Sequence, residues 1–116
     1  MNIVNKENAE HYMWGNNCEG WRIVNSEEMT IIFEKMPPGT SEKMHFHEIS
    51  RQFFFIIRGK ASIETDEQTY TLEKNEGIEI LPGIRHRFYN PSENTVEFLV
   101  TSFPSAIKDR TETAKP

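Results

Sequence analysis

The sequence predicts an all-β sandwich or barrel that forms a single domain. Short apolar runs alternate with turn residues along the 116 residues. No segment keeps the period of an amphipathic helix over several turns. A chain of this length can bury one hydrophobic core but not two.

The N-terminal region, residues 1–28, is expected to be an arm followed by a first strand. It is rich in aromatic residues, with Tyr12, Trp14 and Trp21 close together. These side chains could line the rim of a pocket or pack at a contact between two copies of the chain. Cys18 has no basic neighbour to lower its thiol pKa, so we interpret it as a buried or incidental thiol rather than a nucleophile.

Residues 29–103 carry the predicted barrel. The first strand, residues 29–36, ends at Pro37, Pro38 and Gly39, which favour a turn. Further strands are expected at residues 52–58, 60–66, 68–74, 77–81, 85–90 and 95–103. Residues 104–116 are a polar tail without apolar spacing, which we interpret as a mobile end.

The histidines predict a metal site. His45 and His47 are two residues apart, so in an extended strand both imidazoles lie on the same face. Gln52 follows on the next strand, and His86 comes after the Pro82-Gly83 turn. Together these four residues are expected to bind one divalent transition metal ion, Zn, Fe, Ni or Mn. The alternative is that the histidines are ordinary surface or hydrogen-bonded core residues.

Two runs resemble the signature motifs of the cupin family. The first, from Gly39 to Gly59, reads GTSEKMHFHEISRQFFFIIRG and keeps the paired histidines, but has Gln52 where Glu is usual. The second, from Asn75 to Asn90, reads NEGIEILPGIRHRFYN and keeps the closing Gly, His and Asn. Its opening departs from the motif, because Asn stands where Gly is usual, yet Asn tolerates a left-handed turn. The resemblance implies a jelly-roll barrel, also called a double-stranded β-helix, with His45, His47, Gln52 and His86 as the metal ligands.

Gln52 changes the charge of the predicted site. An amide oxygen contributes a dipole where a carboxylate would contribute a negative charge, so we expect weaker metal binding and a more acidic bound water. This trend favours a Lewis-acid role without settling it. In the alternative interpretation, Gln52 makes hydrogen bonds inside a barrel that binds no metal.

Strand alternation divides the side chains of residues 52–58 between two faces. If Gln52 points inward, Phe54 and Ile56 do so as well. The other three apolar side chains point outward: Phe53, Phe55 and Ile57. Such a row needs a cover, and cupins commonly dimerise through such a face, so a homodimer is expected. The alternative is that these residues form ordinary core between two sheets.

The overall composition narrows the class of partner. The formal net charge of -5 and pI near 5.4 argue against nucleic acid or an anionic membrane as the main partner. No apolar stretch reaches the ~20 residues of a membrane helix, and the start lacks the apolar region of a secretory signal. The single cysteine excludes an internal disulfide, and a cytoplasmic location is expected.

The sequence therefore favours a small metal-binding cupin. We expect an enzyme of isomerase, cyclase or dioxygenase type that acts on an oxygen-rich small molecule bound in the barrel. The alternative is a non-catalytic module that binds a sugar or another metabolite, and a purely structural barrel is a third interpretation. No inward carboxylate can be placed from the sequence, so the catalytic acid and base remain unassigned.

Overall fold

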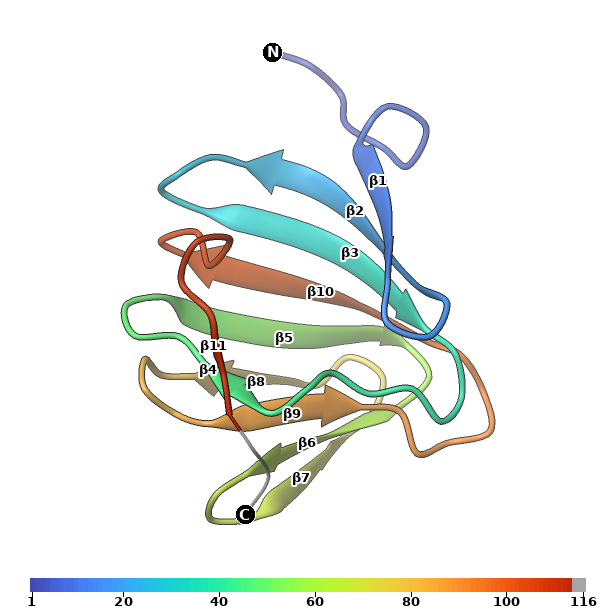
Figure 1. The fold of residues 1–116 in the computed structure, drawn as a ribbon. Helices are drawn as coiled ribbons and strands as arrows, with labels where there is room; N and C mark the ends of the chain where they lie inside the picture. Colours follow the sequence, from blue (N-terminus) through green and yellow to red (C-terminus); the bar gives the residue numbers. More distant parts are fainter. Residues whose placement is uncertain (114–116) are drawn as a thin grey trace.

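The computed structural model describes residues 1–113, which form two antiparallel sheets facing each other (Figure 1). The strands, in chain order, are β1 (Glu10–Trp14), β2 (Cys18–Asn25), β3 (Thr30–Met36), β4 (His45–Phe46), β5 (Arg51–Arg58), β6 (Ala61–Thr65), β7 (Thr69–Leu72), β8 (Gly77–Ile80), β9 (His86–Tyr89), β10 (Val96–Phe103) and β11 (Thr111–Glu112). The larger sheet has the order β1-β2-β3-β10-β5-β8, and the smaller has the order β11-β4-β9-β6-β7. The predicted all-β jelly roll is confirmed.

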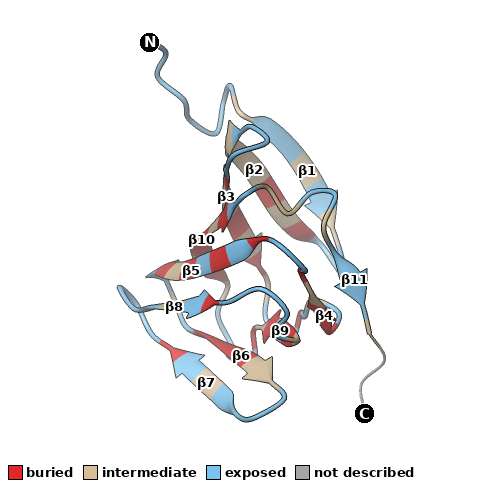
Figure 2. Ribbon diagram, turned by 90° about the vertical axis from the view of Figure 1, so that its left-hand side faces the viewer, coloured by how far each residue is buried: buried red, intermediate tan, exposed pale blue. Residues whose placement is uncertain are grey.

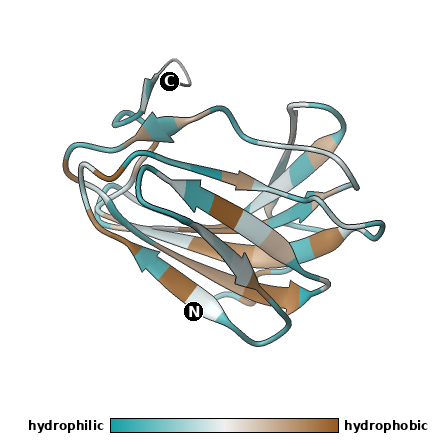
Figure 3. Ribbon diagram, turned by 90° about the horizontal axis from the view of Figure 1, so that it is seen from below, coloured by the Kyte–Doolittle hydropathy of each residue, from teal (hydrophilic) through white to brown (hydrophobic). Residues whose placement is uncertain are grey.

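Strand positions between residues 29 and 103 also follow the prediction. The apolar runs become strands β3 and β5 to β10, each within two residues of its expected limits. Figure 3 shows hydrophobic residues alternating with hydrophilic ones along the strands. Residues 1–113 offer no helix with the length and apolar character that a membrane span requires.

Two turns depend on residues that tolerate positive φ. Asn75, which stands where the cupin motif has Gly, has a φ of 67°, as its residue type allows. Gly59 has a φ of 84°, and a Cβ there would lie 2.9 Å from the Thr95 carbonyl oxygen. Glycine is therefore required at position 59 for both conformation and space.

The interior is divided into a polar end and an apolar end. On each of β5, β9 and β10, the inward-facing residue nearest the histidine end is polar. The next inward-facing residue along each of these strands is apolar. The polar residues are Gln52, His86 and Ser102, and all three are buried. Below them, Phe54, Phe88 and Phe98 form a cluster with ring centroids 4.2 to 6.1 Å apart. The apolar end supplies the core on which the polar end is built.

Strand β5 has one buried face and one partly exposed face, as Figure 2 shows by its alternating colours. Gln52, Phe54 and Ile56 are buried, which confirms the predicted alternation. On the outer face Phe53 is 39% exposed and Ile57 is 36% exposed. The alternative in which these outer side chains form core between the two sheets is therefore wrong for the single chain.

The two ends of the chain are more structured than expected. Residues 1–28 contain two strands, β1 and β2, where one was expected, and residues 1–9 precede them without forming a strand. The interpretation of residues 104–116 as a mobile end is wrong for residues 104–113, because β11 pairs with β4 (Figure 1). Residues 114–116 lie outside the described part of the chain. Backbone pairing, which needs no apolar side chains, explains why a polar segment docks here.

Candidate metal centre

Three histidines converge at the polar end of the barrel. His45 on β4 lies directly opposite His86 on β9, and His47 follows immediately after β4. One nitrogen from each ring lies within 4.8 Å of those of the other two, and all three residues are buried. The structure thus brings together the three imidazoles that the sequence singled out, in an arrangement that could hold a metal ion.

The backbone fixes the orientation of each imidazole. Each Nδ1 atom faces a carbonyl oxygen at hydrogen-bond distance, 2.7 Å for His45 and 2.8 Å for His86, with a third such contact for His47. The acceptors belong to Lys43, Ile84 and Asp109. Because a carbonyl only accepts, each Nδ1 carries the proton and each Nε2 keeps a lone pair. This is the tautomer that binds metal through Nε2.

Burial keeps the rings of His45 and His86 neutral. Loss of solvation lowers the pKa of His45 to about 4, helped by the positive charge of Arg110. Burial also lowers the pKa of His86 to about 4, although the Glu42 carboxylate opposes the shift. Neutral imidazole is the form that binds metal ions, so these two rings need not lose a proton to bind one at neutral pH.

Gln52 lies beside the histidines with its carbonyl oxygen turned toward them. Its Oε1 is 3.2 Å from His86 Nε2, and its amide Nε2 donates a hydrogen bond of 2.9 Å to Ser102 Oγ. With Nδ1 of His86 protonated, two lone pairs face each other across this short distance. His47 Nε2 is also buried without a hydrogen-bond partner among residues 1–113. A cation shared by these atoms would satisfy all of them, so the donor set fits a metal ion.

The C-terminal segment holds the loop that follows His47. Both carboxylate oxygens of Asp109 accept hydrogen bonds of 2.8 to 2.9 Å from the backbone N–H groups of residues 48–50. Although desolvation acts to raise it, these hydrogen bonds hold the pKa of the Asp109 carboxyl below its usual value. No local sequence pattern signals this contact, because it joins residues about 60 positions apart.

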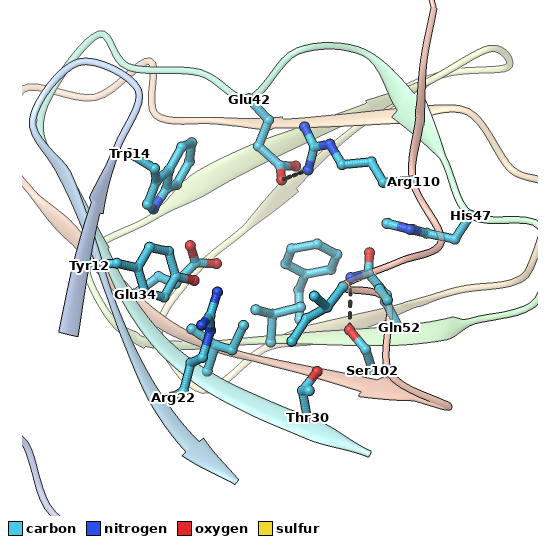
Figure 4. A pocket seen from close by; sticks show the side chains of 15 residues that line it. Tyr12, Trp14, Arg22, Thr30, Glu34, Glu42, His47, Gln52, Ser102 and Arg110 are labelled. Carbon is cyan, nitrogen blue, oxygen red and sulfur yellow. Dashed lines mark hydrogen bonds and ion pairs between the residues drawn. The ribbon is translucent and has the colours of Figure 1, made fainter. Parts of the chain in front are cut away.

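A cavity of about 370 Å³ adjoins the histidines, and His47 and Gln52 form part of its wall (Figure 4). The remaining lining is contributed mainly by β1, β2, β3, β10 and the C-terminal segment. Its residues are Tyr12, Trp14, Arg22, Thr30, Ile32, Glu34, Glu42, Phe54, Val100, Ser102, Ala106, Ile107 and Arg110. Such a volume suits a small organic molecule.

Two carboxylates, which sequence reasoning missed, reach this site. Glu42 Oε2 lies 3.9 Å from His45 Nε2 and 3.7 Å from the Arg110 guanidinium. Glu34 on β3 is buried in the cavity wall, and desolvation followed by the Glu42 charge raises its pKa to about 8. Glu34 is therefore largely protonated at neutral pH. The sequence pattern that could have revealed Glu34 is the alternation of residues 30–36, which puts this Glu on the same face as Ile32 and Met36.

Other residues singled out in the sequence have clear places. Tyr12 and Trp14 line the cavity, whereas Trp21 packs elsewhere against Phe33. Cys18 is a fully buried free thiol, and burial raises its pKa. Asn90 donates hydrogen bonds to the carbonyls of residues 36 and 94, so it holds a turn rather than the metal site.

Comparisons with known proteins agree with the fold. A model of the cupin domain family matches residues 32–102. Polyketide synthase CurC of Streptomyces cyaneus is 29% identical over 73 residues, which cover 63% of this chain and 47% of CurC. The chain thus spans about half the length of the curated relatives it matches.

Solved structures share the architecture at low sequence identity. The polyketide cyclase RemF of Streptomyces resistomycificus has a TM-score of 0.82 at 16% identity, covering all of this chain and 87% of RemF. A sugar phosphate isomerase of the cupin superfamily from Silicibacter pomeroyi has a TM-score of 0.80 at 14% identity, covering 98% and 93% of the two chains. At these identities the likeness shows the fold alone.

Proposed function

The chain belongs to the cupin domain family, and we propose that it is a metal-dependent enzyme acting on an oxygen-rich small molecule bound in the cavity beside the histidines. His45, His47, His86 and Gln52 would hold one divalent transition metal ion, Zn, Fe, Ni or Mn. The proposed reaction class is isomerisation or cyclisation. The second candidate is a non-catalytic small-molecule binding module, which the same cavity would serve.

The observation that carries the proposal is the orientation of the imidazoles. All three Nδ1 atoms face backbone carbonyls, which leaves three Nε2 lone pairs and the Gln52 carbonyl oxygen at one buried place. A purely structural barrel would leave His47 Nε2 without a donor and His86 Nε2 facing the Gln52 carbonyl oxygen, at a cost of about 1 to 3 kcal/mol for each unsatisfied buried group. This cost favours a cation site over a structural cluster.

The charge of the donor set supports a Lewis-acid role. Three neutral imidazoles and one amide would leave the charge of the ion undiminished, with Glu42 as the nearest carboxylate. When bound, such an ion polarises a carbonyl or hydroxyl group of the substrate. Apolar side chains, including Phe54 and Val100, line part of the cavity, and Glu34 can hold a proton at the cavity wall.

The relatives support this reaction class without fixing the substrate. CurC and the tetracenomycin protein TcmJ are described as polyketide synthase proteins, RemF as a polyketide cyclase, and the Silicibacter protein as a sugar phosphate isomerase. Cyclisation of a polyketone and isomerisation of a sugar both begin with a polarised carbonyl group. That shared requirement is what the proposed site would supply.

A test of the proposal starts with protein purified without an affinity tag and loaded with each metal in turn. Isomerase and cyclase assays on sugars and on aryl polyketones are run beside oxygen-consumption assays on enediols, diketones and thiols. We expect turnover that is lost on chelation and restored by one metal. Metal below about a tenth of an equivalent with no uptake on titration would contradict the metal site. Stoichiometric ligand binding without turnover would favour the binding module.

We also propose that the outer face of β5 joins two copies of the chain. Phe53 and Ile57 are each more than a third exposed there, and Phe55 lies between them with its ring centroid 6.4 Å from that of Phe53. A contiguous apolar strip of this kind marks an interaction surface. In sedimentation equilibrium we expect a dimer that Phe53→Glu converts to a monomer. A monomeric parent protein would contradict this proposal.

A further inference from the structure

The end of the cavity away from the histidines also has unsatisfied polar groups. Three side-chain polar atoms are buried without a hydrogen-bond partner among residues 1–113, and all three belong to residues that line this one cavity. They are Trp14 Nε1, Arg22 Nε and His47 Nε2. His47 belongs to the candidate metal centre, so two N–H donors remain to be explained. Figure 4 shows Trp14 and Arg22 on the side of the cavity opposite His47.

Buried donors without partners are rare in folded proteins. Each one costs about 1 to 3 kcal/mol relative to a hydrogen-bonded state, and most such groups in native structures bind a water, an ion or a ligand. Two of them on one wall of a cavity therefore indicate that an acceptor atom of a bound molecule completes the site.

A third donor lies beside them. The Glu34 carboxyl is buried in the same wall, where desolvation raises its pKa and the Trp14 indole acts to lower it, although the contact with Trp14 lacks the geometry of a full hydrogen bond. The groups around Glu34 are Tyr12 on β1, Arg22 on β2, Glu42 before β4 and Arg110 in the C-terminal segment. Since desolvation keeps Glu34 largely protonated at neutral pH, its hydroxyl can donate as well.

The backbone is shaped to bring these groups together. Gly20 on β2 pairs with Tyr12 on one side and with Glu34 on the other. A Cβ at Gly20 would lie 2.4 Å from Cζ of Tyr12, so only glycine lets the phenol ring lie across β2 toward Glu34. The Arg22 guanidinium then packs 4.7 Å from the centroid of that ring.

The charges at this end argue against an anionic ligand. Arg22 Nη1 forms a 2.8 Å ion pair with Glu10, and Arg110 lies 3.5 to 3.7 Å from carboxylates of Glu42 and Glu112. Both cavity guanidinium groups therefore already have carboxylate partners. A phosphate would have to compete with them in a site that also contains Glu34 and Glu42. Most of the remaining lining is apolar: Ile32, Phe54, Val100, Ala106 and Ile107.

We propose that Trp14, Arg22 and Glu34 form a subsite that binds an oxygen of an uncharged, largely apolar ligand, while a second oxygen of the same ligand faces His47 and Gln52. The substrate class is then a hydroxylated aromatic ketone or similar molecule rather than a sugar phosphate. This assignment rests on the proposed function in one respect, that the cavity beside the histidines is the substrate site.

The test measures ligand binding by calorimetry on chelator-treated protein, so that it does not depend on metal. The probe is a naphthalenediol with one hydroxyl on each ring, and a hexose phosphate is the comparison ligand. Trp14→Phe removes the indole N–H but keeps an aromatic ring, and Arg22→Lys removes Nε but keeps the charge. Trp21→Phe is the matched control, because Trp21 packs against Phe33 and does not line the cavity.

We expect the diol to bind the parent protein and Trp21→Phe equally, and Trp14→Phe and Arg22→Lys each about tenfold more weakly, as for loss of one buried hydrogen bond. The hexose phosphate should bind more weakly than the diol. If Trp14→Phe does not fold, as judged by circular dichroism, the affinity of Arg22→Lys for the diol alone tests the subsite. Equal affinity in Arg22→Lys, stronger binding of the hexose phosphate, or no binding of the diol would each overturn the assignment. Diol binding by a protein that takes up no metal would overturn the proposed function only.

Discussion

The two ends of the cavity are polar in opposite ways. At the histidine end, Nε2 lone pairs and the Gln52 oxygen accept, whereas at the Trp14 end the indole, the guanidinium and the protonated Glu34 donate. The histidine end is fixed by backbone carbonyls, and the Trp14 end by side chains on β1, β2 and β3. The histidine end thus presents acceptors suited to a cation, whereas the Trp14 end presents donors suited to a ligand oxygen.

The same difference implies that the two ends should respond separately to mutation. Changes at the histidine end should alter metal binding, because they remove a lone pair or the carbonyl that orients it. Changes at the Trp14 end should alter ligand binding and the pH dependence of stability while metal binding remains.

Loss of one imidazole should have the largest effect. We expect His86→Ala to abolish stoichiometric metal binding, with at least about a hundredfold loss of affinity, since one of three nitrogen ligands is removed. His11→Ala is the matched control, because His11 is exposed and pairs with Glu19 outside the site. Metal content is measured by mass spectrometry. Equal metal content in the two variants would show that the ligand assignment is wrong.

At the Trp14 end, the buried Glu34 carboxyl should make the stability of the protein depend on pH. Its pKa rises from an ordinary 4.5 to about 8 in the folded chain, so the folded state holds a proton that the unfolded state has released. The stabilisation that the bound proton gives to the folded state is therefore fully present below about pH 4.5 and is lost as pH rises through about 8. Glu34→Gln cannot ionise, so its free energy of unfolding should exceed that of the parent by one to a few kcal/mol above about pH 8.

Urea unfolding at about pH 5 and about pH 9 measures this difference. Glu79→Gln, a half-exposed carboxylate paired with Arg51, provides the control and should follow the parent protein. Metal content of Glu34→Gln should match the parent. Parallel curves for Glu34→Gln and the parent would contradict a protonated Glu34.

Asp109 should have an intermediate effect at the histidine end. Asp109→Ala removes the three hydrogen bonds that hold the loop after His47, so we expect metal affinity to fall about tenfold. Lys108→Ala, in the same segment but exposed, should bind metal as the parent does. Competition with a chromogenic chelator gives the affinities. Unchanged affinity in Asp109→Ala would mean that the loop keeps His47 in place without its hydrogen bonds to the Asp109 carboxylate.

Gln52→Glu should have the smallest effect and the opposite sign. A carboxylate adds one negative charge next to the cation, so binding of Fe(II) or Mn(II) should tighten by about tenfold or less, offset by the cost of burying the charge. Ser102, which now accepts from the amide of Gln52, can donate its hydroxyl proton to the carboxylate instead. Weaker binding of both metals would indicate that residue 52 does not touch the ion.

Local patterns predicted the barrel and the histidine end. Strands β3 and β5 to β10 follow from apolar runs between turn residues, and the inward positions of Gln52 and His86 follow from alternation. These features depend on neighbours within one strand or one turn, which a sequence displays directly. Local patterns did not predict the Trp14 end, because it joins residues from β1, β2 and β3 across a glycine.

By itself, the sequence determined the strands between residues 29 and 103, the turn at Asn75, and the face on which each imidazole lies, since backbone preference and two-residue periodicity act locally. Only the tertiary structure decided that a polar C-terminal segment docks on β4, that Asp109 caps the loop after His47, and that Glu34 becomes a buried acid. Strand alternation indicates the face of Glu34, but its loss of solvation and the hydrogen bonds between distant segments depend on what the folded chain places nearby.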